Sequence, residues 1–439
     1  MSQPDGVIDA LIAGTWTDPK SGKHYGIPVE DIEIAPTVAG REAELVRARH
    51  GGQRLMVVHD AFTREALGAR VLEALKADGG TVEELVWEKP RCTIDGVEEL
   101  RVLTKDAEAL VAVGSGTVSD SVKYATYLDE RTYSVFPTSP MNAYTTPTAS
   151  VSFGGMKKSL TCHSAKGVFF DLEVLSKCPP RLISAAFADV ICRTTSQVDW
   201  LLSHLLFGTD YMDVPYTLLG YYEDDMVASA AKIRAGEPEA LALLTRVAAI
   251  MGLSTSFTGT THVGSMAEHM ISHTIDMFAA KRDGKHPGSS HGEQVGVATL
   301  TMARLQNAVL QQASPPNVSP TLVPESRLAR EYGGEMAGTM TEATVAKALD
   351  GAGAERLNAL LGERWDNIRA ELLGFMRPAE EIDAAMAEAG CQRTGEELGL
   401  SAGFYRDAVR DARFIRDRYS MLDLADDSGA LAPFVATLH

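Results

Sequence analysis

The chain has 439 residues, of which 45% are hydrophobic, 7% aromatic and 23% charged. This composition excludes a disordered chain, and at roughly 150 residues per domain the length suggests about two or three structural units. Asp and Glu number 59 against 41 Lys and Arg, and the net charge of −18 makes nucleic acid and anionic lipid poor partners. No apolar run approaches the roughly 18 residues of a membrane-spanning helix. Asp5 and Asp9 lie where a signal peptide would be basic, so we expect a cytoplasmic protein.

The five cysteines form no C-x-x-C pair, so the sequence predicts neither a disulfide framework nor a thiolate metal site. We expect them to be reduced residues of the core. They are Cys92, Cys162, Cys178, Cys192 and Cys391.

The first part of the chain alternates short apolar runs with helical stretches. This order is typical of strand–helix–strand units that form a parallel sheet covered by helices. The predicted strands cover residues 54–60, 82–87, 109–113, 133–136 and 168–170. The predicted helices cover residues 62–77 and about 118–128. We therefore expect an α/β domain over residues 1–178.

The pattern changes after Pro179 and Pro180, where Ala-, Leu- and Met-rich segments with helical spacing replace the alternation of strands. Helices are predicted over residues 181–207, 237–251 and 293–313. Residues 314–324 are too rich in proline for a helix interior and are predicted as a surface loop or a lid. We therefore expect an all-α domain over residues 179–439.

A glycine-rich loop, Gly114-Ser-Gly-Thr-Val-Ser-Asp120, joins a predicted strand to a predicted helix. Glycines let the backbone approach an anion, and the N–H groups of a helix N-terminus point at it. The loop therefore suits a pyrophosphate, although any tight strand-to-helix turn also favours glycine. Its G-x-G-x-x-x-D spacing, and its place after a later strand, argue against an ordinary Rossmann domain.

Asp60 ends the first predicted strand, where a carboxylate can accept hydrogen bonds from the two ribose hydroxyls of an adenosine. The same residue is in position to cap the helix that follows. A carboxylate here would repel a 2′-phosphate. Together with the glycine loop, Asp60 predicts NAD(H) in preference to NADP(H).

Three histidines and one aspartate form a candidate metal site in the second part of the chain. His269 and His273 are four residues apart and share one helix face, and His291 precedes a long predicted helix. Asp189 lies near the start of the first predicted C-terminal helix. One carboxylate and two or three imidazoles suit a divalent zinc, nickel or iron ion with one position open for substrate. Histidine pairs at this spacing are also common on helices without a metal, and Asp189 also suits a helix cap, so the spacing leaves both interpretations open.

Several motifs occur in a fixed order along residues 54–425. They are Gly114-Ser-Gly-Thr-Val-Ser-Asp120-Ser-Val-Lys123, Pro137-Thr-Ser-Pro-Met-Asn142-Ala-Tyr-Thr-Thr146, Gly154-Gly-Met-Lys-Lys158, Ala188-Asp189 with Asp199-Trp200, Glu268-His269-x-x-x-His273, His291-Gly-Glu-Gln-Val-Gly-Val and Arg413-Phe-Ile-Arg-Asp-Arg-Tyr-Ser-Met-Leu-Asp423. In this order they resemble the sn-glycerol-1-phosphate dehydrogenase branch of the iron-containing alcohol dehydrogenase and dehydroquinate synthase-like superfamily.

The resemblance implies an α/β nucleotide-binding domain, an all-α C-terminal domain and an active site in the cleft between them. It implies that Asp189, His269 and His291 are the ligands of one divalent ion, with His273 beside the ion as a proton relay. It also implies that Thr138 and Thr146 approach the nicotinamide half of the dinucleotide. The residues implied to contact or shape the phosphate site are Gly114, Ser115, Gly116 and Asp120.

Two positions depart from the pattern of that branch. Asn142 stands where relatives usually have an Asp beside the substrate; it can orient a hydroxyl but cannot act as a carboxylate base or repel an anion, which favours an acidic or more oxidised substrate. Thr261-His262-Val263 stands where relatives usually have Arg-Pro, so a guanidinium suited to phosphate is missing there. Lys157, Lys158 and His262 are alternative phosphate partners, although solvated surface lysines explain the pair more simply.

We expect reversible hydride transfer between NAD(H) and a small polyol, a polyol phosphate or the corresponding ketone, with the ion at the reacting oxygen. A cyclase similar to dehydroquinate synthase, which uses NAD transiently, is the alternative enzyme; Asp189 in place of the Glu usual there disfavours it. A non-catalytic nucleotide-binding relative is the alternative outside the enzymes, motivated by Asn142 and His262. The resemblance also implies a homodimer.

Overall fold

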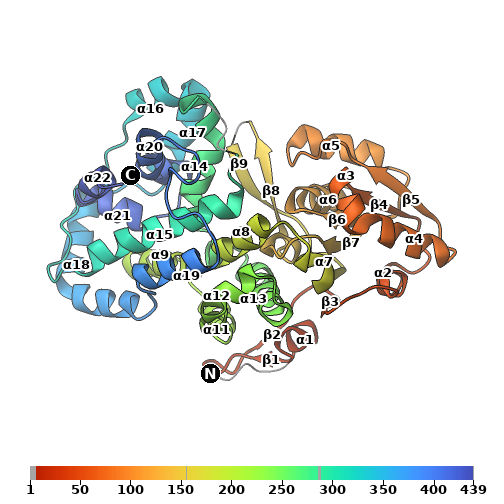
Figure 1. Cartoon of the computed structure of the whole chain (residues 1–439). Helices are drawn as coiled ribbons and strands as arrows, with labels where there is room; N and C mark the ends of the chain where they lie inside the picture. The colour runs from red at the N-terminus through yellow and green to blue at the C-terminus, as the bar shows by residue number, and fades with distance from the viewer. Residues whose placement is uncertain (1–5, 155, 285–287, 439) are drawn as a thin grey trace. The chain divides into compact units, whose positions relative to one another are not determined.

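The computed structural model describes residues 6–154, 156–284 and 288–438, so Gly155 of the motif Gly154-Gly-Met-Lys-Lys158 lies outside the described residues. The chain divides into two compact units (Figure 1). The first, here called the sheet unit, comprises residues 1–186 and 213–261, and the second, the helical unit, comprises residues 187–212 and 262–439.

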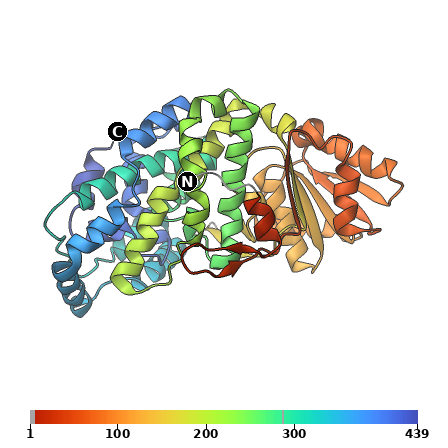
Figure 2. The same ribbon diagram turned by 90° about the horizontal axis from the view of Figure 1, so that it is seen from below.

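A six-stranded parallel sheet forms the centre of the sheet unit, as the sequence predicts, and its strands lie side by side in both views (Figures 1 and 2). The strands, in their order across the sheet, are β3 (Asp31–Ala35), β10 (Gly167–Asp171), β7 (Thr132–Pro137), β6 (Ala109–Gly114), β4 (Leu55–His59) and β5 (Val82–Val86). Strands β4, β6 and β10 are buried along their whole length, which explains why their sequences are apolar except for His59 and Asp171 at the ends of β4 and β10. The five predicted strands are confirmed.

Strand β3 is absent from the prediction because Asp31 and Glu33 interrupt its apolar pattern. It lies at one edge of the sheet, where polar side chains can reach solvent. Four more strands form two antiparallel pairs outside the main sheet. They are β1 (Trp16–Thr17) with β2 (His24–Tyr25), and β8 (Thr148–Phe153) with β9 (Met156–Thr161).

Helices cover both faces of the sheet (Figure 1). One face packs through Val57 and Val111 against Val46 of α2 and Val71 of α4 in a single apolar cluster. The helices of this part are α1 (Val7–Ile12), α2 (Glu42–His50), α3 (Ala61–Thr63), the π-helical turn η1 (Arg64–Gly68), α4 (Ala69–Ala77), α5 (Ile94–Leu103), α6 (Gly116–Leu128), the short 3-10 helix η2 (Asn142–Tyr144) and α7 (Leu172–Ser176).

The predicted helix over residues 62–77 is present, but its first part is the π-helical turn η1. Gly68 lies so close to the buried His59 that a Cβ at this position would be 2.1 Å from the ring Nδ1. The wider turn therefore lets the helix pass over the end of β4.

The sheet unit also includes residues 213–261, which the sequence assigns to the C-terminal domain. These residues form α10 (Val214–Leu219), α11 (Glu223–Ala228), α12 (Ala230–Arg234) and α13 (Pro238–Thr258). Helix α13 is long and apolar enough to cross a membrane, but 78% of its apolar window is buried inside the fold. This burial is typical of a core helix, and it explains why the compact units differ from a single division after residue 178.

The described residues of the helical unit form helices and connecting loops only. Helix α8 (Pro180–Val190) contains the boundary between the units, and the remaining helices follow in chain order. They are α9 (Arg193–Phe207), the 3-10 helix η3 (His262–Gly264), α14 (Ala267–Arg282), α15 (His291–Leu310), α16 (Glu325–Tyr332), α17 (Gly334–Val345), α18 (Gly351–Leu373), α19 (Ala379–Glu388), α20 (Ala402–Asp411), the 3-10 helix η4 (Ala412–Ile415), α21 (Met421–Asp427) and α22 (Leu431–Ala436). The predicted loop over residues 314–324 is confirmed.

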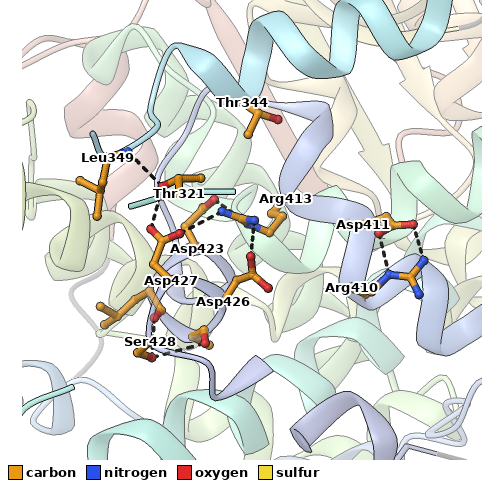
Figure 3. A network of polar contacts seen from close by, with 12 residues as sticks. Thr321, Thr344, Leu349, Arg410, Asp411, Arg413, Asp423, Asp426, Asp427 and Ser428 are labelled. Atoms are coloured by element: carbon orange, nitrogen blue, oxygen red, sulfur yellow. Dashed lines mark hydrogen bonds and ion pairs between the residues drawn. The ribbon is translucent and has the colours of Figure 1, made fainter. Parts of the chain in front are cut away.

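A buried charge network fixes the C-terminal part of the helical unit (Figure 3). Arg413 is 1% exposed, and its guanidinium is bound by Asp423, Asp426 and Asp427 of α21. Lys347 adds a second cation 2.8 Å from Asp423. A buried guanidinium without counter-charges would destabilise the fold, so the three carboxylates explain why Arg413 can be buried.

Candidate metal and dinucleotide sites

Asp189, His269 and His291 come together in the helical unit. The Nε2 atom of His269 lies 3.6 Å from Oδ1 of Asp189, and Nε2 of His291 lies 3.9 Å from the same oxygen. Ligand atoms bound tetrahedrally at about 2.1 Å from an ion are about 3.4 Å apart, so these separations are close to those of a metal site. The donor set also fits, because one carboxylate and two imidazoles suit zinc, nickel or iron.

The three residues come from three helices. His269 lies in the first turn of α14, and His291 is the first residue of α15. Asp189 lies near the end of α8 rather than near the start of a helix, because the single helix predicted over residues 181–207 is divided into α8 and α9. Helix α15 passes very close to α8, since a Cβ at Gly296 would be 2.6 Å from the Cβ of Ala188.

Each histidine of this triad has a partner on its other ring nitrogen. The Nδ1 atom of His269 is 3.1 Å from Oε1 of Glu268, a fully buried residue whose carboxylate also accepts a hydrogen bond from the backbone N–H of Met266. A carboxylate only accepts, so Nδ1 of His269 carries the hydrogen and Nε2 presents its lone pair towards Asp189. Sequence reasoning assigned no separate role to Glu268, although its place directly before His269 points to one.

The ring of His291 is oriented in the same way. Its Nδ1 atom is 3.1 Å from the hydroxyl of Ser272, and that hydroxyl lies 3.0 Å from the side-chain oxygen of Gln294. When Ser272 donates to Gln294, it accepts the hydrogen on Nδ1 of His291, which leaves Nε2 as the ligand atom. Ser290 caps α15 through a reciprocal hydrogen-bond pair with Glu293 and so fixes the start of the helix at His291.

His273 lies beside the triad. Its ring centroid is 6.1 Å from that of His269 and 5.6 Å from that of His291. Its Nδ1 atom is 3.3 Å from Nη2 of Arg416. His273 therefore lies close to the three candidate ligands, and its role as a proton relay stays a prediction.

A second group of possible ligands shares His269. Atoms of Cys192, Glu268 and His269 also lie within 4.8 Å of one another, and all three residues are buried. Burial, with the charges of Glu268 and Asp189, raises the pKa of the Cys192 thiol well above its ordinary value. The thiol is therefore protonated in the protein without a metal ion. Glu268 already engages Nδ1 of His269 and the backbone N–H of Met266, so the group that contains Asp189 is the better candidate.

The glycine loop lies in the sheet unit between β6 and α6. Ser115 is the N-cap of α6 but makes no capping hydrogen bond with its side chain. A Cβ at Gly116 would have its nearest neighbour at 3.7 Å, so packing within the protein does not require glycine at this position. The first turn of α6 thus leaves space beside its backbone N–H groups, as a phosphate site requires.

Asp120 is held by other groups of the sheet unit. Its two carboxylate oxygens accept hydrogen bonds from Nζ of Lys123 and from the backbone N–H of Ser150, both at 3.0 Å. Lys123 is fully buried and also donates to the backbone oxygens of Ala143 and Thr148. Asp120 therefore shapes the loop region rather than presenting its charge to a ligand.

The two threonines predicted beside the nicotinamide are half-buried. The N–H of Thr138 donates to the backbone oxygen of Gly114 at 3.2 Å, which ties the end of β7 to the glycine loop. The hydroxyl of Thr146 lies 2.9 Å from that of Thr148. Both residues thus belong to the segment that adjoins the loop.

Asp60 follows β4 and is the N-cap of α3. Its Oδ1 atom accepts the N–H of Thr63 at 2.9 Å, and the Thr63 hydroxyl interacts with the N–H of Asp60 in return. Of the two interpretations that the sequence leaves open, the helix cap is therefore present. One carboxylate oxygen is used in the cap, and the residue remains half-buried at the C-terminal end of the strand.

Asn142 begins η2 and packs on α13. Its side-chain amide lies 3.7 Å from the sulfur of Met251, and a Cβ at Gly252 would be 2.4 Å from the backbone oxygen of Asn142. This close approach of α13 fixes the segment that carries Asn142. The glycine at position 252 is required for it.

Comparisons with known proteins show what the chain is similar to. The family model described as iron-containing alcohol dehydrogenase matches residues 33–179. The chain is 29% identical to glycerol-1-phosphate dehydrogenase [NAD(P)+] of Methanothermobacter thermautotrophicus over 276 residues, 63% of this chain and 77% of the relative. It is 24% identical to the protein of the same name from Bacillus velezensis over 431 residues, 96% of this chain and 97% of the relative.

The chain is thus similar in sequence to glycerol-1-phosphate dehydrogenases, and part of its sheet unit matches the model of the iron-containing alcohol dehydrogenases. The fold agrees, because the crystal structure of a probable glycerol dehydrogenase from Sinorhizobium meliloti matches with a TM-score of 0.60. That match covers 93% of this chain and 97% of the other at 16% sequence identity. The predicted fold class, an α/β region followed by an all-helical region, is confirmed.

Proposed function

We propose that the protein is a metal-dependent, NAD(P)-linked oxidoreductase that acts on a small polyol or polyol phosphate. The observation that supports this most strongly is the meeting of Asp189, His269 and His291, residues far apart in the sequence, with each histidine oriented by a partner on its other nitrogen. The relationship to the glycerol-1-phosphate dehydrogenases supports the same reaction class.

The triad would hold one divalent ion, which we propose to be zinc, nickel or iron. Such an ion acts as a Lewis acid towards a substrate oxygen when it is bound. Glu268 and Ser272 hold the rings of His269 and His291 so that both Nε2 atoms face Asp189. Because these partners are in place in the protein, little side-chain reorganisation accompanies binding.

His273 is the proposed proton relay. Its ring lies beside the rings of His269 and His291, from where an imidazole can exchange a proton with the substrate hydroxyl or with water. Asn142 is proposed to orient a substrate hydroxyl through its amide, and it supplies no charge. The substrate is thus a small molecule whose alcohol is oxidised or whose ketone is reduced.

The dinucleotide is proposed to bind at the C-terminal ends of the strands of the sheet unit. Gly114, Ser115 and Gly116 would receive its phosphates at the N-terminus of α6, and Thr138 and Thr146 would adjoin its nicotinamide. Nicotinamide supplies hydride chemistry when it is bound. Asp60 supports NAD(H) in preference to NADP(H), because its carboxylate lies at the end of β4 and would repel a 2′-phosphate.

The test is a screen of polyols, their phosphates and the matching ketones with both nicotinamide cofactors, after elemental analysis of the purified protein. Net formation of NADH that depends on substrate, in protein with about one metal per chain, is the expected result. Release of phosphate without net NADH would instead indicate a cyclase, and tight NAD binding with no turnover would indicate a non-catalytic relative. We also propose a cytoplasmic homodimer, which light scattering of the purified protein tests for its subunit number.

A further inference from the structure

An ion pair lies beside the end of β4, where the adenosine of the dinucleotide is proposed to bind. Arg64 begins η1, and its Nε atom lies 2.6 Å from Oε1 of Glu84 on the neighbouring strand β5. The backbone N–H of Arg64 donates to the backbone oxygen of Asp60 at 2.8 Å. Arg64 therefore stands one turn after the residue proposed to bind the ribose hydroxyls. An arginine in such a place is the usual partner of a 2′-phosphate.

The turn that carries Arg64 adjoins the glycine loop. Strand β4 pairs in parallel with β6, with Val58 opposite Ala112, so the residues that follow the two strands lie at the same edge of the sheet. The hydroxyl of Thr63, which donates its oxygen to the cap at Asp60, would lie only 3.2 Å from a Cβ at Gly114. Ligands of parallel sheets bind at this edge. A nucleotide with its phosphates at the loop would therefore bring its ribose to Asp60.

Glu84 is fixed by a second donor. The Nε2 atom of His59, a fully buried residue at the end of β4, lies 3.1 Å from the same Oε1 atom that Arg64 contacts. A carboxylate only accepts, so Nε2 of His59 carries the hydrogen. The hydrogen bond from Arg64 lowers the pKa of Glu84, which is therefore ionised at neutral pH. The buried imidazole thus anchors the carboxylate, and the carboxylate holds the Arg64 guanidinium at β5.

These contacts set the charge that a nucleotide meets at the end of β4. Burial lowers the pKa of His59, so its ring is neutral at pH 7. The charges of Arg64 and Glu84 offset each other, and Asp60 leaves a net negative charge. A 2′-phosphate, which carries a charge of about −1.5 to −2, would be repelled by Asp60 and would compete with Glu84 for the guanidinium. A free 2′-hydroxyl brings no charge and encounters neither obstacle.

We propose that Glu84 is a specificity-determining residue, which holds Arg64 away from the 2′ position of the adenosine ribose and so keeps the site selective for NAD(H). A guanidinium released from Glu84 would pair with a 2′-phosphate, because its fork matches two phosphate oxygens at once. This assignment rests on the proposed function for the place of the dinucleotide. It adds to Asp60 a second residue, on a different strand, that selects between the two cofactors.

The experiment measures binding of NADPH and NADH to the metal-loaded protein by fluorescence titration. Glu84→Gln is expected to lower the ratio of the NADPH Kd to the NADH Kd by roughly tenfold or more, because a hydrogen bond between charged groups forms at the 2′-phosphate. The same substitution combined with Arg64→Gln is expected to lose this gain. Glu83→Gln is the matched control: it removes the same charge from β5, but successive side chains of a strand point to opposite faces. The melting temperature of each variant establishes that the fold is intact.

Normal NADH binding with an unchanged ratio in folded Glu84→Gln would overturn the assignment and leave the proposed function intact. A gain that persists in the double variant would also overturn it, because repulsion by Glu84 alone would then explain the selectivity. An equal gain in Glu83→Gln would count against the specific contact with Arg64 and indicate a general effect of charge. Binding of neither nucleotide to the wild-type protein would remove the proposed function and this assignment together.

Two nucleotide fragments locate the effect at the 2′ position. Adenosine 5′-monophosphate and adenosine 2′,5′-bisphosphate differ only by the 2′-phosphate, and each can displace NADH in a competition titration. Glu84→Gln is expected to tighten binding of the bisphosphate by roughly tenfold or more and to leave binding of the monophosphate nearly unchanged. Arg64→Lys in the Glu84→Gln background is expected to keep part of the gain, because it retains the charge but not the fork. Equal gains for both fragments would contradict recognition at the 2′ position.

Discussion

The sheet unit and the helical unit hold their predicted site residues in different ways. In the helical unit, three side chains from α8, α14 and α15 meet, and partners orient the two histidines towards the aspartate. In the sheet unit, Asp60 and Asp120 are engaged by groups nearby in the same fold. Recognition of a dinucleotide in the sheet unit would therefore depend on the backbone N–H groups of the first turn of α6 and on the open space at Gly116. We therefore expect substitutions to abolish metal binding in the helical unit, but only to weaken dinucleotide binding in the sheet unit.

The largest expected effect comes from His269→Ala. Removing one of three ligands should abolish both bound metal and turnover, which elemental analysis and a coupled assay measure. His204→Ala is the control, because His204 is an exposed histidine on α9 of the same unit. Full activity without loss of metal in His269→Ala would remove the proposed ion site.

Glu268→Gln tests whether the partner of His269 matters as much as its position suggests. We expect roughly 10–100-fold weaker metal binding, because the ring loses the carboxylate that fixes its tautomer. Titration with Co²⁺, followed by its visible absorption, measures the affinity and the ligand geometry separately. Glu335→Gln, an exposed residue in the first turn of α17, should bind metal as the wild type does.

Gly116→Val examines the sheet unit. The added side chain has room within the protein itself, so the melting temperature should be nearly unchanged. The same side chain would fill the space into which a dinucleotide phosphate comes, and we expect roughly tenfold or weaker binding of NADH by fluorescence titration. Thr117→Val, an exposed neighbour, should bind NADH normally. Unchanged NADH affinity in Gly116→Val would place the phosphates elsewhere.

Asp60→Asn separates the helix cap from the charge. Asn is as good a cap as Asp, so the free energy of unfolding should change by only a few tenths of a kcal/mol. Loss of the carboxylate should raise the ratio of NADP(H) to NAD(H) use, measured as kcat/KM with each cofactor. An unchanged ratio would leave Asp60 with the capping role alone.

The smallest effect is a pH dependence in the charge network of the helical unit. Burial, with Asp423 nearby, raises the pKa of Asp427 to about 6 despite the attraction of Arg413. Because the folded pKa exceeds the unfolded value, the folded state binds more protons, and this contribution to stability falls as pH rises from about 4 to about 6. Asp427→Asn should reduce that fall, as melting temperatures at pH 4.5 and 7 would show. The same slope in both proteins would contradict the raised pKa.

Local patterns predicted much of the fold. The predicted strands and helices were found where apolar runs or helical periodicity were strong, as in β4, β6, α6 and α15. Strand β3 was missed because its acidic residues lie at a sheet edge, and the break between α8 and α9 was missed because both helices are apolar across it. The grouping of α13 with the sheet unit follows from burial against η2 and α7, which no local pattern reports.

The sequence by itself determined the residue types of the candidate sites and their order, because motif spacing and helix-terminal chemistry are local properties. Only the tertiary structure decided which residues meet. It brought Asp189 within 4 Å of two histidines and placed Arg416 beside His273. It also engaged both carboxylate oxygens of Asp120 in hydrogen bonds with donors of the protein. The physical reason is that such contacts depend on how helices distant in the chain pack, as at the close approach of Gly296 to Ala188.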